Sequence, residues 1–156
     1  MRTDYRVIAI ASDVVEKARA TGRAPRYGHP THTEVAAGYG PCRHCLRHFR
    51  VGEERRVLFT YDAFADTDAL PLPGPVFAHA DGCERYPEDA GFPRQLGEHP
   101  LTLTGYGRGR RPRADEQVDD GDVESAIQRL LARRDVDYIH VRDTTAGCFD
   151  LAIARA

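Results

Sequence analysis

The chain has 156 residues, 41% of them hydrophobic and 29% charged, and a formal net charge of −2 with the histidines neutral. These values are ordinary for one globular domain and exclude a disordered chain, a coiled coil, collagen and a disulfide-dense miniprotein. Of the 22 Lys and Arg residues only Lys17 is a lysine, a bias typical of a GC-rich genome, and the net charge gives no general attraction to nucleic acid or to an anionic membrane.

The first forty residues predict one strand, one helix and one long loop. Tyr5–Ala11 is predicted to be a strand, and Val14–Ala20 is predicted to be a helix that stops at Gly22, a usual residue just after a helix end. From Arg23 to Gly40 the sequence is rich in Gly, Pro, Thr and His, which is typical of a loop.

No targeting signal is expected at the start of the chain. The apolar run after Asp4 is much shorter than the core of a signal peptide, and no stretch approaches the roughly 20 apolar residues that a membrane-spanning helix needs. We therefore expect a cytoplasmic protein with no membrane partner, whose cysteines are reduced thiols, metal ligands or catalytic groups.

The middle of the chain predicts three strands. Arg55–Tyr61, Pro75–His79 and Leu101–Thr104 combine β-branched, aromatic and aliphatic residues between Gly- and Pro-rich loops. The next segment, Gly105–Arg113, is basic and glycine-rich, and an acidic stretch follows it at Asp115–Glu124. A solvated hairpin loop balanced by its acidic neighbour is favoured by the overall charge, with nucleic-acid binding through Arg108–Arg113 as the alternative.

The last third predicts a helix and a hairpin. Val123–Arg134 carries its apolar residues on one stripe, with Asp120 or Asp122 as the N-cap. Val136–Arg142 and Cys148–Ala154 are predicted to pair as antiparallel strands. Pairing odd-numbered residues with odd-numbered residues buries the apolar set and gathers the polar set on the opposite face, unless a β-bulge intervenes at the tip. The residues expected on that polar face are Tyr138, His140, Arg142, Cys148 and Asp150.

The strongest chemical pattern is a Cys-x2-Cys pair at Cys42 and Cys45 followed by His-x3-Cys at His79 and Cys83. Zinc prefers four thiolate or imidazole ligands in a tetrahedron, and a site with four protein ligands has no open position for catalysis. The pattern therefore predicts a structural zinc site. Alternatives are a redox dithiol, an unpaired loop thiol at Cys83, and a ligand set in which His44 or His48 replaces one of the four.

The polar face of the hairpin is the second pattern. Cys148 is a candidate nucleophile, His140 a candidate base and Asp150 a candidate residue to orient the imidazole, which is the order of groups in a Cys-His-Asp relay. A mildly polar sheet face with Cys148 as a small buried residue is the structural alternative. Arg43, Tyr61 and Arg142 are further candidates for binding a small anionic molecule, with the guanidinium groups as anchors.

Three segments also resemble a bacterial family catalogued as domain of unknown function 1203. They are PCRHCLRHFRVGEERRVLFTYDAF, GPVFAHADGCERY and DYIHVRDTTAGCF, and the resemblance extends from about Gly40 to Arg155. It implies a small cytosolic bacterial protein of one domain, without an assigned activity. It also implies that Pro41–Arg43, Gly74–Phe77 and Gly147–Phe149 belong together.

These patterns predict a single α+β domain over residues 1–156, in which residues 1–40 are an N-terminal elaboration. A mainly antiparallel sheet of five or six strands is expected, flanked by two helices. The expected function is binding of a small anionic molecule in a polar pocket near the structural zinc site. The alternatives are a thiol-dependent enzyme that uses Cys148 and His140, and a nucleic-acid-binding module.

Overall fold

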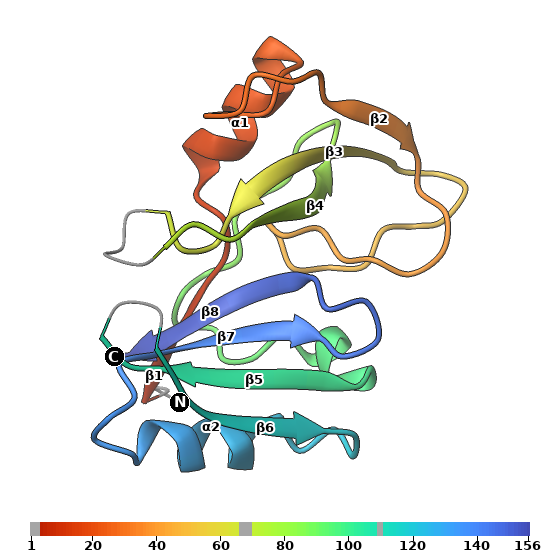
Figure 1. The fold of residues 1–156 in the computed structure, drawn as a ribbon. Coiled ribbons are helices and arrows are strands. Elements are labelled where there is room, and N and C mark those ends of the chain that lie inside the picture. The colour runs from red at the N-terminus through yellow and green to blue at the C-terminus, as the bar shows by residue number, and fades with distance from the viewer. Residues whose placement is uncertain (1–3, 66–69, 109–110) are drawn as a thin grey trace.

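A computed structural model describes residues 4–65, 70–108 and 111–156. Within these ranges the chain forms two α-helices, one short 3-10 helix and eight strands in two antiparallel sheets (Figure 1). The α+β class with mainly antiparallel sheet is confirmed, although the strands divide between two sheets. No helix in the described part of the chain is long and apolar enough to cross a membrane.

The larger sheet has the strand order β1-β8-β7-β5-β6. Its α2 helix covers one face, on which Leu103 of β5 and Val141 of β7 pack against Ile127. Asp122 caps this helix, because its side chain accepts a hydrogen bond from the backbone N–H of Ser125. The elements are β1 (Tyr5–Ile8), β5 (Leu101–Tyr106), β6 (Pro112–Val118), α2 (Val123–Leu131), β7 (Tyr138–Asp143) and β8 (Phe149–Arg155).

The smaller sheet has the order β2-β3-β4 and its own hydrophobic cluster. Val15 and Ala18 of α1 pack in this cluster, and Gly22 ends the helix in the left-handed conformation, with φ of 66°. The elements are α1 (Ser12–Thr21), β2 (His32–Val35), β3 (Arg55–Asp62) and β4 (Pro73–His79), while the 3-10 helix η1 (Arg94–Glu98) lies in the connection that leads back to the larger sheet.

The first forty residues contribute to both halves of the molecule. β1 pairs with β8 at the edge of the larger sheet, α1 packs on the smaller one, and β2 pairs with β3. The segment predicted as loop from Arg23 to Gly40 thus contains a strand, and a second strand, β6, occupies much of the segment predicted to be a basic tip and an acidic stretch. Both are edge strands whose residues are mostly exposed, so they lack the apolar alternation that marks a buried strand.

The β7–β8 hairpin has the predicted register over most of its length. Ile139 pairs with Ile153 and Val141 with Leu151, so odd-numbered residues oppose each other and face α2. A register shift then follows between Val141 and Arg142, and Arg142 pairs with Phe149. The prediction for the end of this strand is therefore wrong in one respect: the irregularity moves Phe149 to the polar face, as β-bulges do when they insert one extra residue.

Candidate metal centre and adjoining cavity

The Cys-x2-Cys segment folds as a tight turn between β2 and β3. The backbone N–H of Cys42 donates to the carbonyl of Arg47 at 3.0 Å, and that of Leu46 donates to the carbonyl of Cys42 at 2.8 Å. Leu46 has a positive φ of 60°, which reverses the chain after Cys45. Leu46 is buried with the core of the larger sheet, whereas Cys42 and Cys45 pack with that of the smaller one, so the turn lies where the two cores meet.

Three other segments hold this turn through backbone hydrogen bonds. Arg43 donates to the carbonyl of Phe77 in β4 at 2.9 Å and accepts from Ile10 at 3.0 Å, while the carbonyl of His44 accepts from Tyr86 at 2.9 Å. The first pair of cysteines is thereby fixed against the end of β4, which carries His79.

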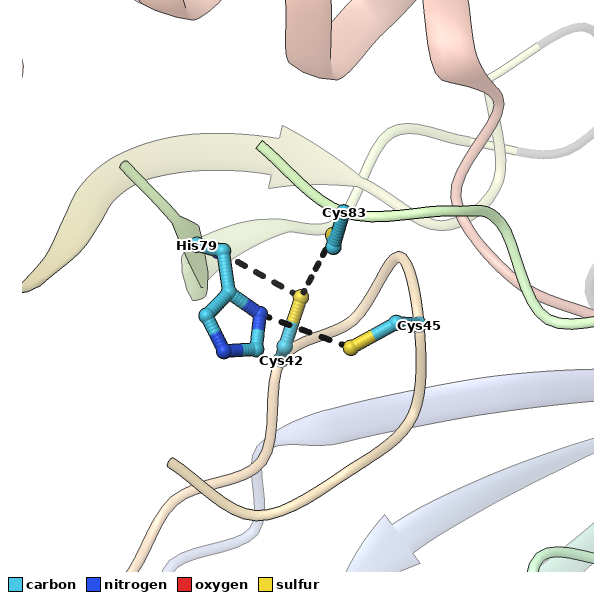
Figure 2. A group of neighbouring side chains, drawn as sticks. All are labelled: Cys42, Cys45, His79 and Cys83. Carbon is cyan, nitrogen blue, oxygen red and sulfur yellow. Dashed lines mark hydrogen bonds between the residues drawn. The ribbon is translucent and has the colours of Figure 1, made fainter. Parts of the chain in front are cut away.

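Cys42, Cys45, His79 and Cys83 bring their ligand atoms together, all within 4.8 Å of one another (Figure 2). The sulfurs of Cys42 and Cys83 are 3.7 Å apart, and the sulfur of Cys45 lies 3.4 Å from Nδ1 of His79. The cysteines are free thiols, not disulfides. A tetrahedron with Zn–S bonds of about 2.3 Å and Zn–N bonds of about 2.0 Å has edges of about 3.8 Å between sulfurs and about 3.5 Å between sulfur and nitrogen. The donor set therefore fits a zinc ion in its chemistry, and the Cys42–Cys83 and Cys45–His79 distances fit the edges of its tetrahedron.

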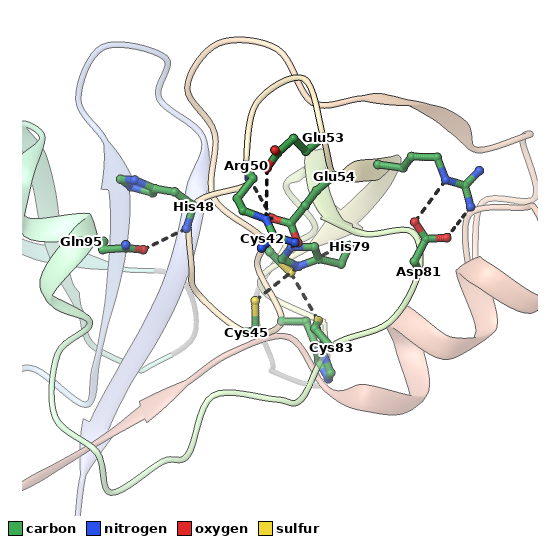
Figure 3. Close-up of polar contacts among 12 residues, drawn as sticks. Cys42, Cys45, His48, Arg50, Glu53, Glu54, His79, Asp81, Cys83 and Gln95 are labelled. Carbon is green, nitrogen blue, oxygen red and sulfur yellow. Dashed lines mark hydrogen bonds and ion pairs between the residues drawn. The ribbon is translucent and has the colours of Figure 1, made fainter.

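The surroundings supply hydrogen-bond donors to the sulfurs. The backbone N–H of His79 donates to the sulfur of Cys42 at 3.4 Å, and Nη2 of Arg19 donates to that of Cys83 at 3.5 Å. Nε2 of His79 lies 3.0 Å from a carboxylate oxygen of Glu54 (Figure 3). When a metal is bound, this contact would favour the tautomer in which Nε2 carries the proton and Nδ1 binds the metal, which is the role that carboxylates often play behind metal-bound histidines.

The electrostatics of the cluster favour one thiolate, at Cys45, because the hydrogen bond from Cys42 to Cys45 raises the pKa of Cys42 far above its ordinary value. A hydrogen bond from Cys42, followed by one from Cys83, lowers the pKa of Cys45 far below its ordinary value. Hydrogen bonds to the sulfurs of Cys45 and Cys83 raise the pKa of His79 to about 10. Without a metal, the protonated imidazole of His79 therefore balances the thiolate of Cys45, and a cation bound at the four ligand atoms would displace protons from His79 and Cys42.

His44 and His48 do not belong to the group of four. Nδ1 of His44 lies 3.1 Å from the sulfur of Cys83, and its Nε2 lies 2.8 Å from the hydroxyl of Ser12, so His44 supports a ligand from outside the tetrad. The ring of His48 packs against Tyr39, with centroids 5.3 Å apart, and its backbone N–H donates to the side chain of Gln95 (Figure 3). The four ligand atoms that the structure brings together therefore come from Cys42, Cys45, His79 and Cys83, without either of these histidines.

A cavity of about 360 Å³ opens between the two sheets. Four residues predicted to be functional line it: Tyr61, His140, Arg142 and Cys148. The ring of His140 is buried among aromatic side chains, and this burial, together with the charge of Arg142, lowers the pKa of His140 to about 4. At neutral pH His140 is therefore an uncharged imidazole.

The structure separates two predicted site residues from this cavity. Asp150 is completely buried and lies 3.2 Å from Nη2 of Arg43, instead of facing His140 as predicted. The irregularity in β8 is the reason, since Phe149 takes the position opposite Arg142. Arg43, for its part, donates from Nε to the carbonyl of Phe149 at 2.9 Å and from Nη1 to that of Pro41 at 2.8 Å, so its guanidinium is committed within the protein.

The Cys-His-Asp relay is thus not assembled. Cys148 and His140 share a cavity, but Asp150 does not orient the imidazole. A neutral histidine with a pKa of about 4 also supplies no positive charge to stabilise a thiolate at neutral pH. Sequence reasoning did not identify Thr104, Phe64, Tyr106 or Phe149 as site residues, because single apolar and hydroxyl side chains carry no signal of their own.

The model of a family described as protein of unknown function (DUF1203) matches residues 39–155. The chain belongs to this family. No match was found among curated proteins or among solved structures. The matched part of this DUF1203 protein begins just before the Cys-x2-Cys turn and contains the metal tetrad, the cavity and the β7–β8 hairpin, while β1, α1 and β2 precede it.

Proposed function

We propose that this DUF1203 protein is a bacterial, cytoplasmic binding protein in which a structural zinc ion fixes the walls of a pocket for a small anion. The observation that carries the proposal is the meeting of four ligand atoms from separate segments within 4.8 Å, at a turn whose Arg43 contacts Phe149 in the wall of a cavity that a cationic side chain lines. Thiol ligands are compatible with a compartment in which cysteines stay reduced.

The proposed role of zinc is structural, because three thiolates and one imidazole complete a tetrahedral shell. Cys42 and Cys45 lie on the turn between the two cores, whereas His79 ends β4 and Cys83 follows it. An ion bound to all four joins segments that the chain connects only through β3 and the loops around it. Its binding free energy then contributes directly to folding.

Arg43 connects the metal turn to the cavity. It lies between the ligand Cys42 and His44, and its guanidinium holds the carbonyl of Phe149, whose ring lines the cavity. The buried ion pair between Arg43 and Asp150 fixes the same segment of β8. Arg43 thus positions a wall of the pocket, and of the two candidate arginines Arg142 is left as the anchor for an anion.

Metal analysis of the purified protein tests the zinc proposal. We expect about one mole of zinc per chain, release of that metal by a strong chelator, and reactivity of the three ligand thiols only after its release. Cys45→Ser removes a ligand and is expected to lose most of the metal, whereas the matched control Cys148→Ser keeps it. Less than about half a mole of transition metal per chain, with all four thiols reactive in the native protein, would overturn the proposal.

Two alternative functions are weaker proposals. A thiol-dependent reaction requires Cys148 to be alkylated below the ordinary pKa of a free thiol, and the neutral state of His140 argues against this. Nucleic-acid binding requires salt-sensitive affinity that arginine substitutions in the Arg108–Arg113 loop abolish. Within that loop Arg110 lies outside the described residues, and Arg108, Arg111 and Arg113 are exposed.

A further inference from the structure

The cavity between the sheets has one cationic group and a wall of aromatic side chains, and small and aliphatic residues complete its lining. It is lined from the smaller sheet by the end of β3 and by Pro73–Val76 of β4, and from the larger sheet by Tyr106, His140 and Arg142. Its volume of about 360 Å³ lies at the lower end of the range for small-molecule sites. The inference below rests on the proposed anion pocket and identifies the class of anion.

The aromatic walls are continuous. The ring centroid of His140 lies 4.6 Å from that of Phe64, 5.1 Å from that of Tyr106 and 5.1 Å from that of Phe149. Tyr61 extends the wall, with its ring 6.1 Å from that of Phe149. All five residues line the cavity. Rings at these distances pack in offset or edge-to-face arrangements, which a planar guest can join.

Arg142 is held in place and retains hydrogen-bonding capacity. Its Nη2 donates to the hydroxyl of Thr104 at 3.1 Å, and that hydroxyl donates in turn to Asp115 at 2.6 Å. Its Nε is buried and has no partner among the described residues. A buried donor without an acceptor costs about 1–3 kcal/mol, so a small movement of Arg142 that brings Nε against a ligand oxygen would relieve a cost that the free protein bears.

The charge in the cavity limits the ligand to a monoanion. His140 is uncharged at neutral pH, so Arg142 supplies the only positive charge among the described lining residues. Oδ1 of the nearby Asp62 accepts hydrogen bonds from the backbone N–H groups of Phe64 and Leu72, at 2.9 Å and 3.1 Å. One guanidinium among aromatic rings matches a carboxylate on a flat apolar body, whereas a phosphate dianion would lose much of its hydration for a single counter-charge.

We propose that this cavity binds a small aromatic carboxylate of one or two rings, with the ring between the aromatic walls and the carboxylate on the guanidinium of Arg142. Thr104 positions the guanidinium, and the zinc turn holds Phe149 through Arg43.

The test is titration calorimetry of the zinc-loaded full chain with benzoate, 2-naphthoate and indole-3-carboxylate. Benzamide, which lacks the charge, and acetate and phosphate, which lack the ring, are the comparison compounds. We expect at least one aromatic carboxylate to bind about tenfold or more tightly than any of these three. Absence of binding by all three aromatic carboxylates up to about 10 mM would overturn the proposal.

Variants locate the site. Arg142→Gln is expected to weaken binding of the aromatic carboxylate about tenfold or more, and the matched control Arg94→Gln, at an exposed position, leaves it unchanged. Arg142→Lys keeps the charge but not the planar donors, so we expect it to lose less affinity than Arg142→Gln and more than Arg94→Gln. This variant replaces Arg142→Gln in the test if Arg142→Gln does not fold. Unchanged affinity in a folded Arg142 variant would contradict the assignment.

The outcomes separate this inference from the proposed function. Acetate or phosphate binding as tightly as the aromatic carboxylates, and dependent on Arg142, would retain the anion pocket and overturn the aromatic class. No binding by any anion to a protein with a full complement of zinc would overturn the pocket and leave the structural zinc intact. Zinc content is measured on every sample, so loss of metal is not mistaken for loss of the ligand site.

Discussion

Replacement of His140 by Gln should reduce the loss of unfolding free energy that the protein undergoes when the pH falls from neutral to acidic. His140 is only 4% exposed and is surrounded by the rings of Phe64, Tyr106 and Phe149. Burial, followed by the charge of Arg142, lowers its pKa from 6.5 to about 4. The unfolded chain therefore binds a proton at a pH at which the folded chain does not.

The sign and size follow from linkage. A histidine whose pKa is lower in the folded state stabilises the protein above the unfolded pKa, and this stability is lost as the pH falls from about 6.5 to about 4. A difference of about 2.5 pKa units corresponds to about 3 kcal/mol over the whole window. Gln cannot be protonated, so the variant does not undergo this loss, whatever its stability at neutral pH.

The assay is urea unfolding of the wild type and of His140→Gln at pH 7 and at about pH 4.5. The difference in unfolding free energy between the two chains should change by about 2–3 kcal/mol between these conditions, in favour of the variant at the lower pH. Protonation of the metal ligands affects both chains alike and cancels in the difference. The control is His32→Gln at an exposed histidine. A difference that stays constant with pH would refute the reasoning.

Two further predictions concern Asp150 and Gly105. Burial raises the pKa of Asp150 to about 6 despite the opposing charge of Arg43, so its contribution to stability is present below the unfolded pKa of about 3.8 and is lost as the pH rises to about 6. On acidification the wild type should therefore gain up to about 3 kcal/mol of unfolding free energy that Asp150→Asn does not gain. The same urea series measures this, and an equal dependence of the unfolding free energy on pH in both chains would contradict it. Gly105→Ala should destabilise the protein by about 1–3 kcal/mol in thermal or urea unfolding, because the new Cβ would lie 2.9 Å from a methyl group of Val136. Gly74→Ala, with open space around it, is the control, and equal effects of the two would count against the packing argument.

Local chemistry was sufficient to predict several elements from the sequence. Asp122 caps α2 and Gly22 ends α1, because caps depend on residues within one helical turn. The ligand pairs of the metal tetrad were likewise recognisable, since each pair lies within a few residues of sequence and thiolate and imidazole groups at such spacing suit a metal ion. The register of the β7–β8 hairpin followed from its alternating apolar residues.

The elements that were missed depend on partners far along the chain. β2 and β6 are exposed edge strands, so their pairing with β3 and β5 supplies hydrogen bonds but leaves no apolar pattern in the sequence. The division into two sheets also has no local signal, because it depends on which strands pair across long stretches of sequence.

The irregularity in β8 decides what the cavity can do. A regular register would have placed Asp150 beside His140 and Phe149 in the core, which is the arrangement of a catalytic relay. With the shift, Asp150 pairs with Arg43 instead, and Phe149 lines the cavity. The imidazole of His140 therefore lies beside the ring of Phe149 and not beside a carboxylate, and it is uncharged at neutral pH. One inserted residue therefore separates Asp150 from the polar face, and Arg43, which the metal turn carries, pairs with it.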